Sequence, residues 1–536
     1  MKTQVQSTAN TMGNAPSSLT AMNQQAKPTA DAKENSSFLL KLPNETLTEI
    51  CKSLCWHCQS VMPTAQDEQE SKFQTQTLIH SPTKALASLS RTSRRLNEIA
   101  NPVLYHGFSA AKAADMYNFM VTIADRPELG KLVKGVVIEH VTLDDENHNL
   151  DMYISLVLER LKALGAQRKS WNILRAIAKR KGLGQYEALA QVILAHLRNI
   201  ETLRLEMHME SPSLDLFNKL ANVSRDSIPV MKPATVLWPH LQDCTLLASH
   251  MSLPPQSDVL DGDIYQLWSG SSLTAYKGFF SLAPRLSSLH TRSMNYFTIN
   301  MTGLENITRL HLQLADFQNG AYLEEMVSSI YSLEEFSFTW TPGTTFVTDL
   351  SHLLDLGNRL DRHKNTLRTL RIGYSCVHGG DDEFGCFPDL TRFTVLEELK
   401  LHGPMMPIPA YLNLHPKDYD PPHFIDLLPV SIRRIHVMYT GKQQVEHLVE
   451  LAEDSTQPPA SRRLPYLEEV TVMSFSEHGD DSNKHSSVLD QDDWDEHFSV
   501  LAQADWDKLH AAYDKTGIAF STRTSSLLEW DLSEFH

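Results

Sequence analysis

The chain has 536 residues, of which 41% are hydrophobic, and this is enough length and apolar content for more than one packed domain. Its formal net charge of −17, from 65 acidic and 48 basic residues, argues against nucleic acid as a partner, because phosphate binding draws its affinity from clustered Lys and Arg. The sequence contains no run of about 18 apolar residues and no apolar signal core near its N-terminus. We therefore predict an intracellular protein, cytoplasmic or nuclear, with no membrane partner and with its six cysteines reduced.

Residues 1–36 are rich in Gln, Asn, Ser, Thr and Ala and show no apolar periodicity. Such a composition cannot bury enough apolar surface to offset the entropy of ordering. The sequence predicts a disordered N-terminal tail over 1–36.

The next element is an amphipathic helix that begins at Leu42-Pro43-Asn44-Glu45. Proline suits the first helical position because its missing N–H would be unpaired there, and glutamate places negative charge in the first turn, where the helix dipole favours it. Leu47, Ile50 and Leu54 then recur at steps of three and four residues, which aligns them on one face.

A second apolar helical pattern follows after a polar interruption. It places Leu86, Leu89, Leu96 and Ile99 on one face, and Asn101-Pro102 is typical of its end. Two short amphipathic helices bury too little surface to be stable alone. Part of their apolar face must therefore meet another helix or another protein.

These two segments resemble the F-box, whose pattern is Leu-Pro-x-Glu, a helix, and then a helix rich in Leu, Ser and Arg. The resemblance covers residues 38–108 and implies docking to a Skp-family linker protein, which joins the F-box to the cullin and RING subunits of an SCF ubiquitin ligase. The residues that the resemblance assigns to the linker-binding face are Leu42, Pro43, Leu47, Ile50, Leu54, Leu86, Leu89 and Leu96.

The segment departs from the F-box pattern in two ways. Residues 55–83 are longer than the usual link between the helices, and Leu96 stands where many members carry Trp. The cost of closing a loop grows by only about 0.6 kcal/mol for each doubling of its length, so we predict a solvated inserted loop near 55–83. The alternative is an ordinary pair of amphipathic helices with proline near the start.

The sequence Cys55-Trp56-His57-Cys58 raises the question of a zinc site, because two thiolates three residues apart can bind one metal from a turn. A structural zinc site needs four ligands, and although Cys51 and His80 are available, no second Cys-x-x-Cys or His pair follows at the expected distance. Cys51, Cys55 and Cys58 also match the buried side of a continued helix. We interpret them as apolar packing residues and predict no metal and no cofactor.

A repeated pattern of apolar residues extends through most of the remaining chain and predicts the end of a helix followed by a short strand. The clearest copies are Leu197-Ile200-Leu203-Leu205, Leu304-Ile307-Leu310-Leu312, Ile330-Leu333-Phe336-Phe338, Phe393-Leu396-Leu399-Leu401 and Leu464-Leu467-Val470-Val472. Weaker copies are Val133-Val136-Ile138, Leu286-Leu289, Leu367-Leu370-Ile372, Ile432-Ile435-Val437 and Leu241 to Leu246.

This pattern resembles leucine-rich repeats, although the Asn or Cys that normally follows the strand is not regularly present. One unit cannot bury its apolar edge alone, so stacked units share a continuous core. We predict an α/β fold: a helical F-box followed by an irregular leucine-rich-repeat-like solenoid over 109–475, with short parallel strands and outer helices, among them 152–164 and 186–197. The alternative is an ordinary α/β domain whose parallel strands begin with leucine-rich turns.

The last segment, 476–536, differs in composition. Trp494, Phe498, Leu501, Trp506 and Leu509 are interspersed with Asp and His, and Gly517-Ile518-Ala519-Phe520 predicts a helix end and a strand. We predict a C-terminal cap, because the exposed end of a solenoid must be covered for solubility.

The combined layout resembles F-box proteins with irregular repeats that are common in filamentous fungi. This resemblance implies a non-catalytic adaptor that recruits an unknown protein substrate to a cullin-RING ligase. The sequence has no His-Glu-x-x-His, Gly-x-Ser-x-Gly or phosphate-loop motif to indicate an enzyme. The second hypothesis for the function is a repeat scaffold that binds proteins without a ligase, and the third is a hydrolase built on an α/β sheet.

Overall fold

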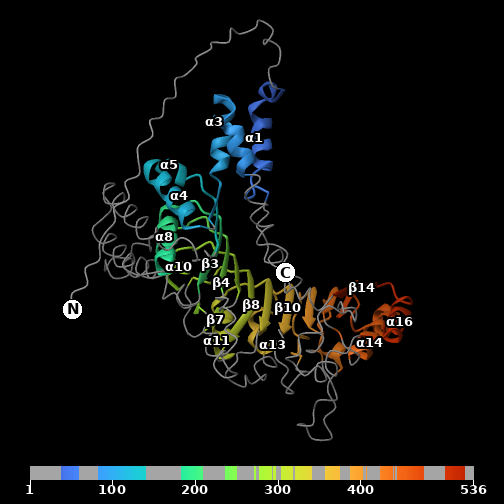
Figure 1. The fold of residues 1–536 in the computed structure, drawn as a ribbon. Coiled ribbons are helices and arrows are strands. Elements are labelled where there is room, and N and C mark those ends of the chain that lie inside the picture. The colour runs from blue at the N-terminus through green and yellow to red at the C-terminus, as the bar shows by residue number, and fades with distance from the viewer. Residues whose placement is uncertain are drawn as a thin grey trace, which may run out of the picture.

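The computed structural model forms an α/β fold in which a small helical unit precedes a long, curved parallel sheet (Figure 1). The tail 1–36, the helix predicted over 152–164, and Trp494 and Phe498 lie outside the described residues. The described residues are 38–59, 83–110, 112–139, 183–208, 236–249, 271–272, 277–292, 294–296, 303–317, 320–340, 356–374, 387–402, 406, 423–438, 440, 444–475 and 501–525.

The helical unit has a small apolar core of its own. Buried Cys51, Leu86 and Val103 meet in it, together with Ala100 and Cys55. The unit consists of the 3-10 helix η2 (Phe38–Lys41), α1 (Asn44–Ser53), a helix over 83–90 and α3 (Arg94–Leu104). The first predicted helix corresponds to α1. The second prediction, of one helix ending at Asn101-Pro102, is wrong: the N–H groups of Arg91 and Thr92 bond three residues back and close the helix over 83–90, and α3 then continues past Pro102 to Leu104. The described part of the inserted loop, 55–59, forms turns.

The ends of these helices follow ordinary capping chemistry, and α1 differs from prediction in two ways. Ser93 caps α3 by accepting a hydrogen bond from the N–H of Leu96 at 3.2 Å. Pro43 lies one residue before α1 and not at its first position, since its carbonyl accepts the first helical hydrogen bond, from Leu47 N–H at 3.1 Å. The predicted continuation of this helix through Cys58 is wrong, because the N–H groups of Leu54 and Cys55 bond three residues back and close the last turn.

Twelve strands form the main path of the sheet, and all of their pairings are parallel. In spatial order they are β1 (Gly107–Ala110), β2 (Gly135–Ile138), β3 (Thr202–His208), β4 (Asp243–Ser249), β6 (Ser288–Arg292), β8 (Arg309–Phe317), β9 (Glu335–Trp340), β10 (Thr369–Tyr374), β11 (Glu398–His402), β12 (Arg434–Met438), β13 (Glu469–Phe475) and β14 (Ala519–Ser525). Two short strands, β5 (Ser271–Ser272) and β7 (Met294–Tyr296), branch from β8. The strands predicted from the ten copies of the repeat are all confirmed.

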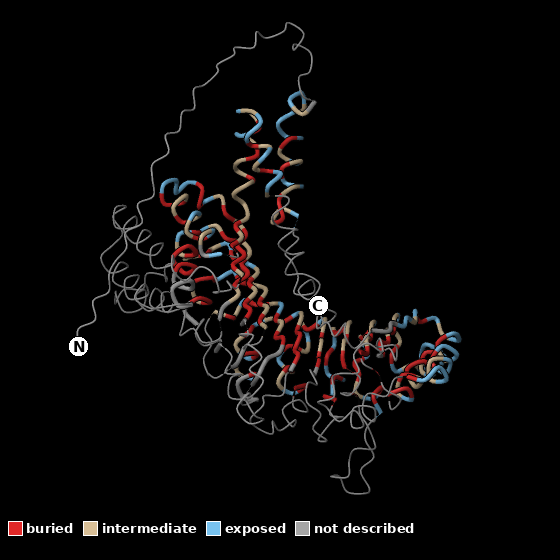
Figure 2. The backbone as a smooth tube through the Cα atoms, viewed as in Figure 1, coloured by how far each residue is buried: buried red, intermediate tan, exposed pale blue. Residues whose placement is uncertain are grey.

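Helices line the outer side of the curved sheet, and the main core lies between the two layers (Figures 1 and 2). The apolar strand positions predicted from the repeat, such as Leu203, Leu310 and Leu399, have no exposed surface. The helices after α3 are α4 (Ala113–Asp125), α5 (Pro127–Gly130), α8 (Leu183–His196), α10 (Lys277–Ser281), α11 (Gly320–Ser329), α13 (Leu356–Arg359), η6 (Asp361–His363), η8 (Phe424–Leu427), α14 (Val445–Thr456), η10 (Pro459–Ser461) and α16 (Gln503–Tyr513). The helix predicted over 186–197 corresponds to α8.

The C-terminal segment extends the sheet by one more strand. β14 pairs in parallel with β13, and the helix before it, α16, packs on α14. Tyr513 at the end of α16 is buried and donates a hydrogen bond from its hydroxyl to the carbonyl of Leu448 at 2.9 Å. The predicted helix end and strand near Gly517 are confirmed.

Trp56 joins the helical unit to the start of the sheet. Its side chain is only 5% exposed and packs on Val137 of β2. The indole also lies against two glycines that face each other in neighbouring strands, Gly107 of β1 and Gly135 of β2. A Cβ added at Gly107 would lie 2.7 Å from Trp56 Cζ2, and one added at Gly135 would lie 2.7 Å from Trp56 Cη2. These glycines make room for the ring.

Candidate functional site

The candidate binding surface of the solenoid is the sheet face opposite the helices. Alternate strand residues turn away from the core, and because neighbouring strands pair in parallel and in register, equivalent residues form rows across the sheet. The row nearest the strand starts contains Arg309, Glu335, Thr369, Glu398, Arg434 and Glu469. The next row contains Arg204, Thr245, His290, His311, Ser337, Arg371, Lys400, His436, Thr471 and Ser521.

Ion pairs connect the two rows in the middle of the sheet. Glu335 on β9 lies 3.4 Å from His311 Nε2 and 3.1 Å from Arg371 Nη2. The hydrogen bond from His311, followed by the charges of His311, Arg371 and Arg309, lowers the pKa of Glu335 to about 2 against the opposing effect of burial. This carboxylate is therefore held in its ionised form.

A second carboxylate, Glu398 on β11, occupies the same position two strands further on. Burial opposes its ionisation, but the hydrogen bond from Arg434 and the charge of Lys400 bring the net pKa of Glu398 below its usual value. Arg434 Nη2 donates to Glu398 at 2.8 Å, and Lys400 Nζ lies 3.8 Å away. The face thus carries fixed charges of both signs.

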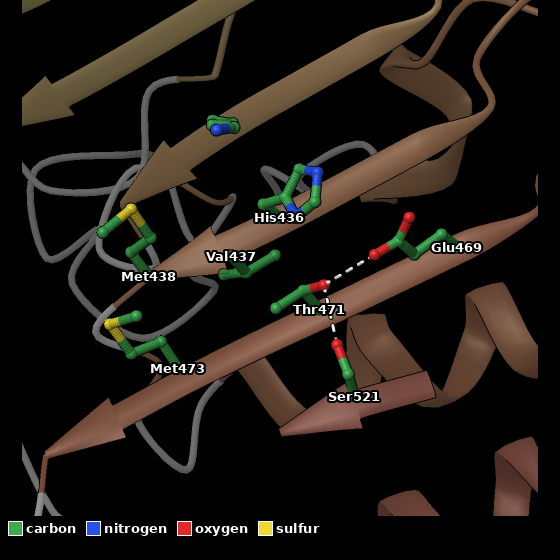
Figure 3. A pocket seen from close by; sticks show the side chains of 8 residues that line it. His436, Val437, Met438, Glu469, Thr471, Met473 and Ser521 are labelled. Atoms are coloured by element: carbon green, nitrogen blue, oxygen red, sulfur yellow. Dashed lines mark hydrogen bonds between the residues drawn. The ribbon is translucent and has the colours of Figure 1, made fainter. Parts of the chain in front are cut away.

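A hollow of about 150 Å³ opens on this face where β11 to β14 meet (Figure 3). Thr471 lies at its centre, and its hydroxyl is 3.3 Å from Glu469 Oε1 and 2.9 Å from Ser521 Oγ. Met438 and Met473 line the hollow toward the strand ends. A lining that combines polar atoms with adaptable thioethers suits one side chain of a bound peptide or protein.

His436 lines this hollow and presents an uncharged ring at neutral pH. Burial, together with the charge of Lys400, lowers the pKa of His436. The imidazole therefore offers both a hydrogen-bond donor and an acceptor. Sequence reasoning missed this site, because alternate polar residues in a strand are also typical of any solvated sheet face.

The structure divides the eight residues of the predicted linker-binding face into two groups. Leu47, Leu86 and Leu96 are buried, with at most 3% of their surface exposed. The other five reach the surface, four of them half-buried and Pro43 exposed; they are Leu42, Pro43, Ile50, Leu54 and Leu89. The buried three stabilise the helical unit, and half-buried Leu54 and Leu89 pack partly against its core.

Arg95 holds the beginning of this face in place. From α3 its guanidinium donates hydrogen bonds to the carbonyls of Leu40 at 2.5 Å and Leu42 at 2.6 Å. It also donates to the side-chain oxygen of Asn44 at 2.8 and 2.9 Å. A charged donor that satisfies three acceptors fixes the segment in front of α1. Sequence reasoning missed this role because the contact spans about fifty residues of chain.

The cysteine-rich turn lies at the base of the helical unit. Four side chains converge there, namely those of Cys55, His57, Cys58 and His106. Burial lowers the pKa of His106 to about 4 and raises the pKa of Cys58 to about 12. Of the two further ligands considered from sequence, Cys51 lies in the core of the helical unit and His80 lies outside the described residues.

Comparison with known families identifies a repeat domain in the second half of the chain. Residues 287–493 match the family model described as a leucine-rich repeat domain. The matched region begins just before β6 and contains the Glu335 and Glu398 ion pairs and most of the hollow, whereas the helical unit lies outside it. No curated protein matches the chain. No helix of the described ranges is both long and apolar enough to span a lipid bilayer.

Proposed function

We propose that this chain recruits a protein target to an SCF-type cullin-RING ubiquitin ligase, with its helical unit docked on a Skp-family linker and its solenoid bound to the target. The leucine-rich repeat domain suggests a role in protein interaction. In this proposal the chain is a non-catalytic adaptor. Holding the target near the ubiquitin-loaded enzyme raises its effective concentration, and the ligase subunits supply the chemistry.

One observation carries the docking part of the proposal: apolar residues of the Leu-Pro-x-Glu helix pair remain at the surface of a unit that has already formed its own core. Ile50 is half-exposed on α1, and Leu42 and Pro43 lie exposed or half-exposed in front of it. A partner that covered such side chains would gain about 1.5–3 kcal/mol for each one fully buried, before the costs of association. Arg95 favours this binding by ordering the segment beforehand.

The polar sheet face supports target binding. Its paired charges, such as Glu335 with Arg371 and Glu398 with Arg434, would select a target surface of complementary charge pattern. The hollow beside Thr471 would accept one protruding side chain of that target. Specificity would then come from the charge pattern, and an anchoring residue would supply much of the affinity.

Docking is tested by recovery of the linker protein with the full-length chain. Leu42→Ala with Pro43→Ala removes surface apolar contacts and leaves the buried leucines in place, so we expect recovery to fall about tenfold or more. Val430→Ala is a matched control, because Val430 is 58% exposed on the solenoid and far from the helical unit in sequence. Equal recovery of the double variant and the wild type would contradict docking through this face.

A repeat scaffold that acts without a ligase is the second candidate. The contact of Trp56 with Gly107 and Val137 favours it, because this contact places the helical unit at the first strand, where a solenoid needs an end cap. The same recovery experiment separates the two functions. If the chain is a scaffold, it should bind its target in cells, and neither the wild type nor the double variant should recover the linker protein.

A further inference from the structure

Two cysteines and two histidines from distant parts of the chain meet between the helical unit and the sheet. Cys55, His57 and Cys58 come from the turns after α1, and His106 lies between the end of α3 and the start of β1. Each offers one ligand atom, and the four atoms lie within 4.8 Å of one another. Cys58 and His106 are 48 residues apart in sequence, yet Cys58 Sγ lies 3.3 Å from His106 Nδ1.

These separations fit a tetrahedral metal centre with little rearrangement. Zinc binds thiolate sulfur at about 2.3 Å and imidazole nitrogen at about 2.0–2.1 Å, so neighbouring ligand atoms around it lie about 3.3–3.8 Å apart. The distance from Cys58 to His106 already falls in this range, and Cys58 Sγ lies 4.0 Å from His57 Nδ1. All four ligand atoms lie within 4.8 Å of one another, so reaching these separations shortens any pair by about 1.5 Å or less.

The surroundings of His57 also match those of a metal ligand. Its Nδ1 faces Cys58, while its Nε2 lies 3.5 Å from the carboxylate of Glu201. Histidines that bind a metal commonly donate their other ring N–H to a carboxylate, which fixes the tautomer and the ring orientation. Glu201 is itself held by Lys134 Nζ at 2.8 Å. The carboxylate is thus positioned independently of the histidine.

We propose that Cys55, His57, Cys58 and His106 form a structural zinc site. Two thiolates and two imidazoles are a ligand set that selects zinc over the hard cations, which prefer oxygen. Cys55 is only 3% exposed, and its sulfur belongs to the small core of the helical unit. Four protein ligands leave no open position for a substrate, so the site stabilises the fold and performs no chemistry.

The metal would hold the helical unit on the sheet. It would connect the turn after α1 to the residue before β1, next to the point where Trp56 packs on β2. Apolar packing at Trp56 and metal ligation at His106 would then fix the same junction from two sides. This inference does not depend on docking to a linker, since an end cap needs the same attachment.

The direct test is the metal content of the full-length chain, expressed with added zinc, purified without a histidine tag and dialysed against metal-free buffer. We expect about one zinc ion per chain, and at least about tenfold less in Cys58→Ala and His106→Gln. Cys51→Ala and His240→Gln are matched controls, because Cys51 lies in the same helical unit and His240 is exposed on the solenoid. Both controls should retain the zinc of the wild type.

A second measurement avoids the question of whether the variants fold. Wild-type chain stripped of metal and loaded with Co²⁺ should show thiolate-to-cobalt charge-transfer absorption and the strong visible bands of a tetrahedral centre, and added Zn²⁺ should abolish both. Wild-type chain without zinc and without this cobalt spectrum would overturn the proposal. So would a disulfide between Cys55 and Cys58 in the protein purified under reducing conditions, or loss of zinc from both control variants.

Discussion

The contact between Trp56 and Gly107 leads to a testable prediction, because the indole lies close to the backbone of Gly107. The indole occupies the space that a Cβ at Gly107 would need, and the three nearest atoms to that position all belong to Trp56. Gly107→Ala therefore overpacks the junction, which typically costs about 1–3 kcal/mol. In a strand, alanine is otherwise more favourable than glycine by about 0.5–1 kcal/mol. The sign of the effect thus depends on whether the indole is present.

Trp56→Ala measures how much the buried indole stabilises the junction between the helical unit and the sheet. A tryptophan buries about 150–250 Å². At about 25 cal/mol for each Å² this gives about 4–6 kcal/mol as an upper estimate, and truncations of buried Trp or Phe typically cost about 3–5 kcal/mol. In the Trp56→Ala background, Gly107→Ala should change from destabilising to neutral or stabilising. The expected coupling energy between the two substitutions is about 1–3 kcal/mol.

Hydrogen exchange of peptides that cover β1 and β2 provides the assay, because it reports the local free energy of opening in a solenoid that need not unfold in one step. The four proteins of the cycle are compared under identical conditions, and peptides from β12 and β13 serve as the internal control. Equal costs of Gly107→Ala with and without the indole would refute the reasoning. The glycine would then be required for another reason.

Three further predictions concern single polar side chains. Glu335→Gln should lower the free energy of unfolding by about 1–3 kcal/mol at pH 6. The pKa of Glu335 is about 2 in the folded chain and about 4.3 in the unfolded chain, so the stabilisation by this carboxylate is complete above about pH 4.3 and is lost as the pH falls toward 2. Denaturation at pH 6 and at pH 3 should therefore show a smaller difference between variant and wild type at the lower pH. His363→Ala should lower the free energy of unfolding by about 2–3 kcal/mol in a denaturation experiment, because buried His363 accepts a hydrogen bond from Leu333 N–H at 3.3 Å and bonds the carbonyl of Val327 at 3.1 Å. Burial lowers the pKa of His363, so the wild type should lose more stability than the variant as the pH falls below about 6.5. Arg95→Ala should speed hydrogen exchange in 38–44, whereas Arg94→Ala, which removes a side chain that is 95% exposed, should not.

The repeated strands could be predicted from sequence because their signal is local and redundant. Each copy places apolar residues at the end of a helix and on one side of the next strand, and both sets are buried in the same core, as Leu197 and Leu203 are. β1 carried no such signal. Its sequence, Gly107-Phe108-Ser109-Ala110, contains a glycine that strands usually avoid, and the reason for that glycine is Trp56, more than fifty residues earlier in the chain.

The cysteine-rich turn shows the opposite case, in which a local signal was misleading. The spacing of Cys51, Cys55 and Cys58 fits one helical face, but the helix ends at Ser53 and only Cys51 lies on it. Helix ends depend on competition between backbone hydrogen bonds and on the burial of nearby residues, here Trp56, so periodicity alone does not locate them. The fourth member of the cluster, His106, lies beyond the inserted loop, and no fixed spacing relates it to the cysteines.

Backbone hydrogen bonds connect successive units of the repeat at the starts of the strands. At the start of nearly every strand of the main path, one carbonyl accepts hydrogen bonds from two successive N–H groups of the next unit, at 2.6 to 3.2 Å. These carbonyls belong to His106, Lys134, Glu201, Gln242, Ser287, Thr308, Glu334, Arg368, Glu397 and Arg433. The series therefore begins at His106, whose side chain lies in the cysteine and histidine cluster. In a solenoid the first unit has a neighbour on one side only, so it opens most easily. A metal bound through His106 would restrain the first carbonyl of the series, and its removal should loosen β1 and β2 before it affects the units beyond them.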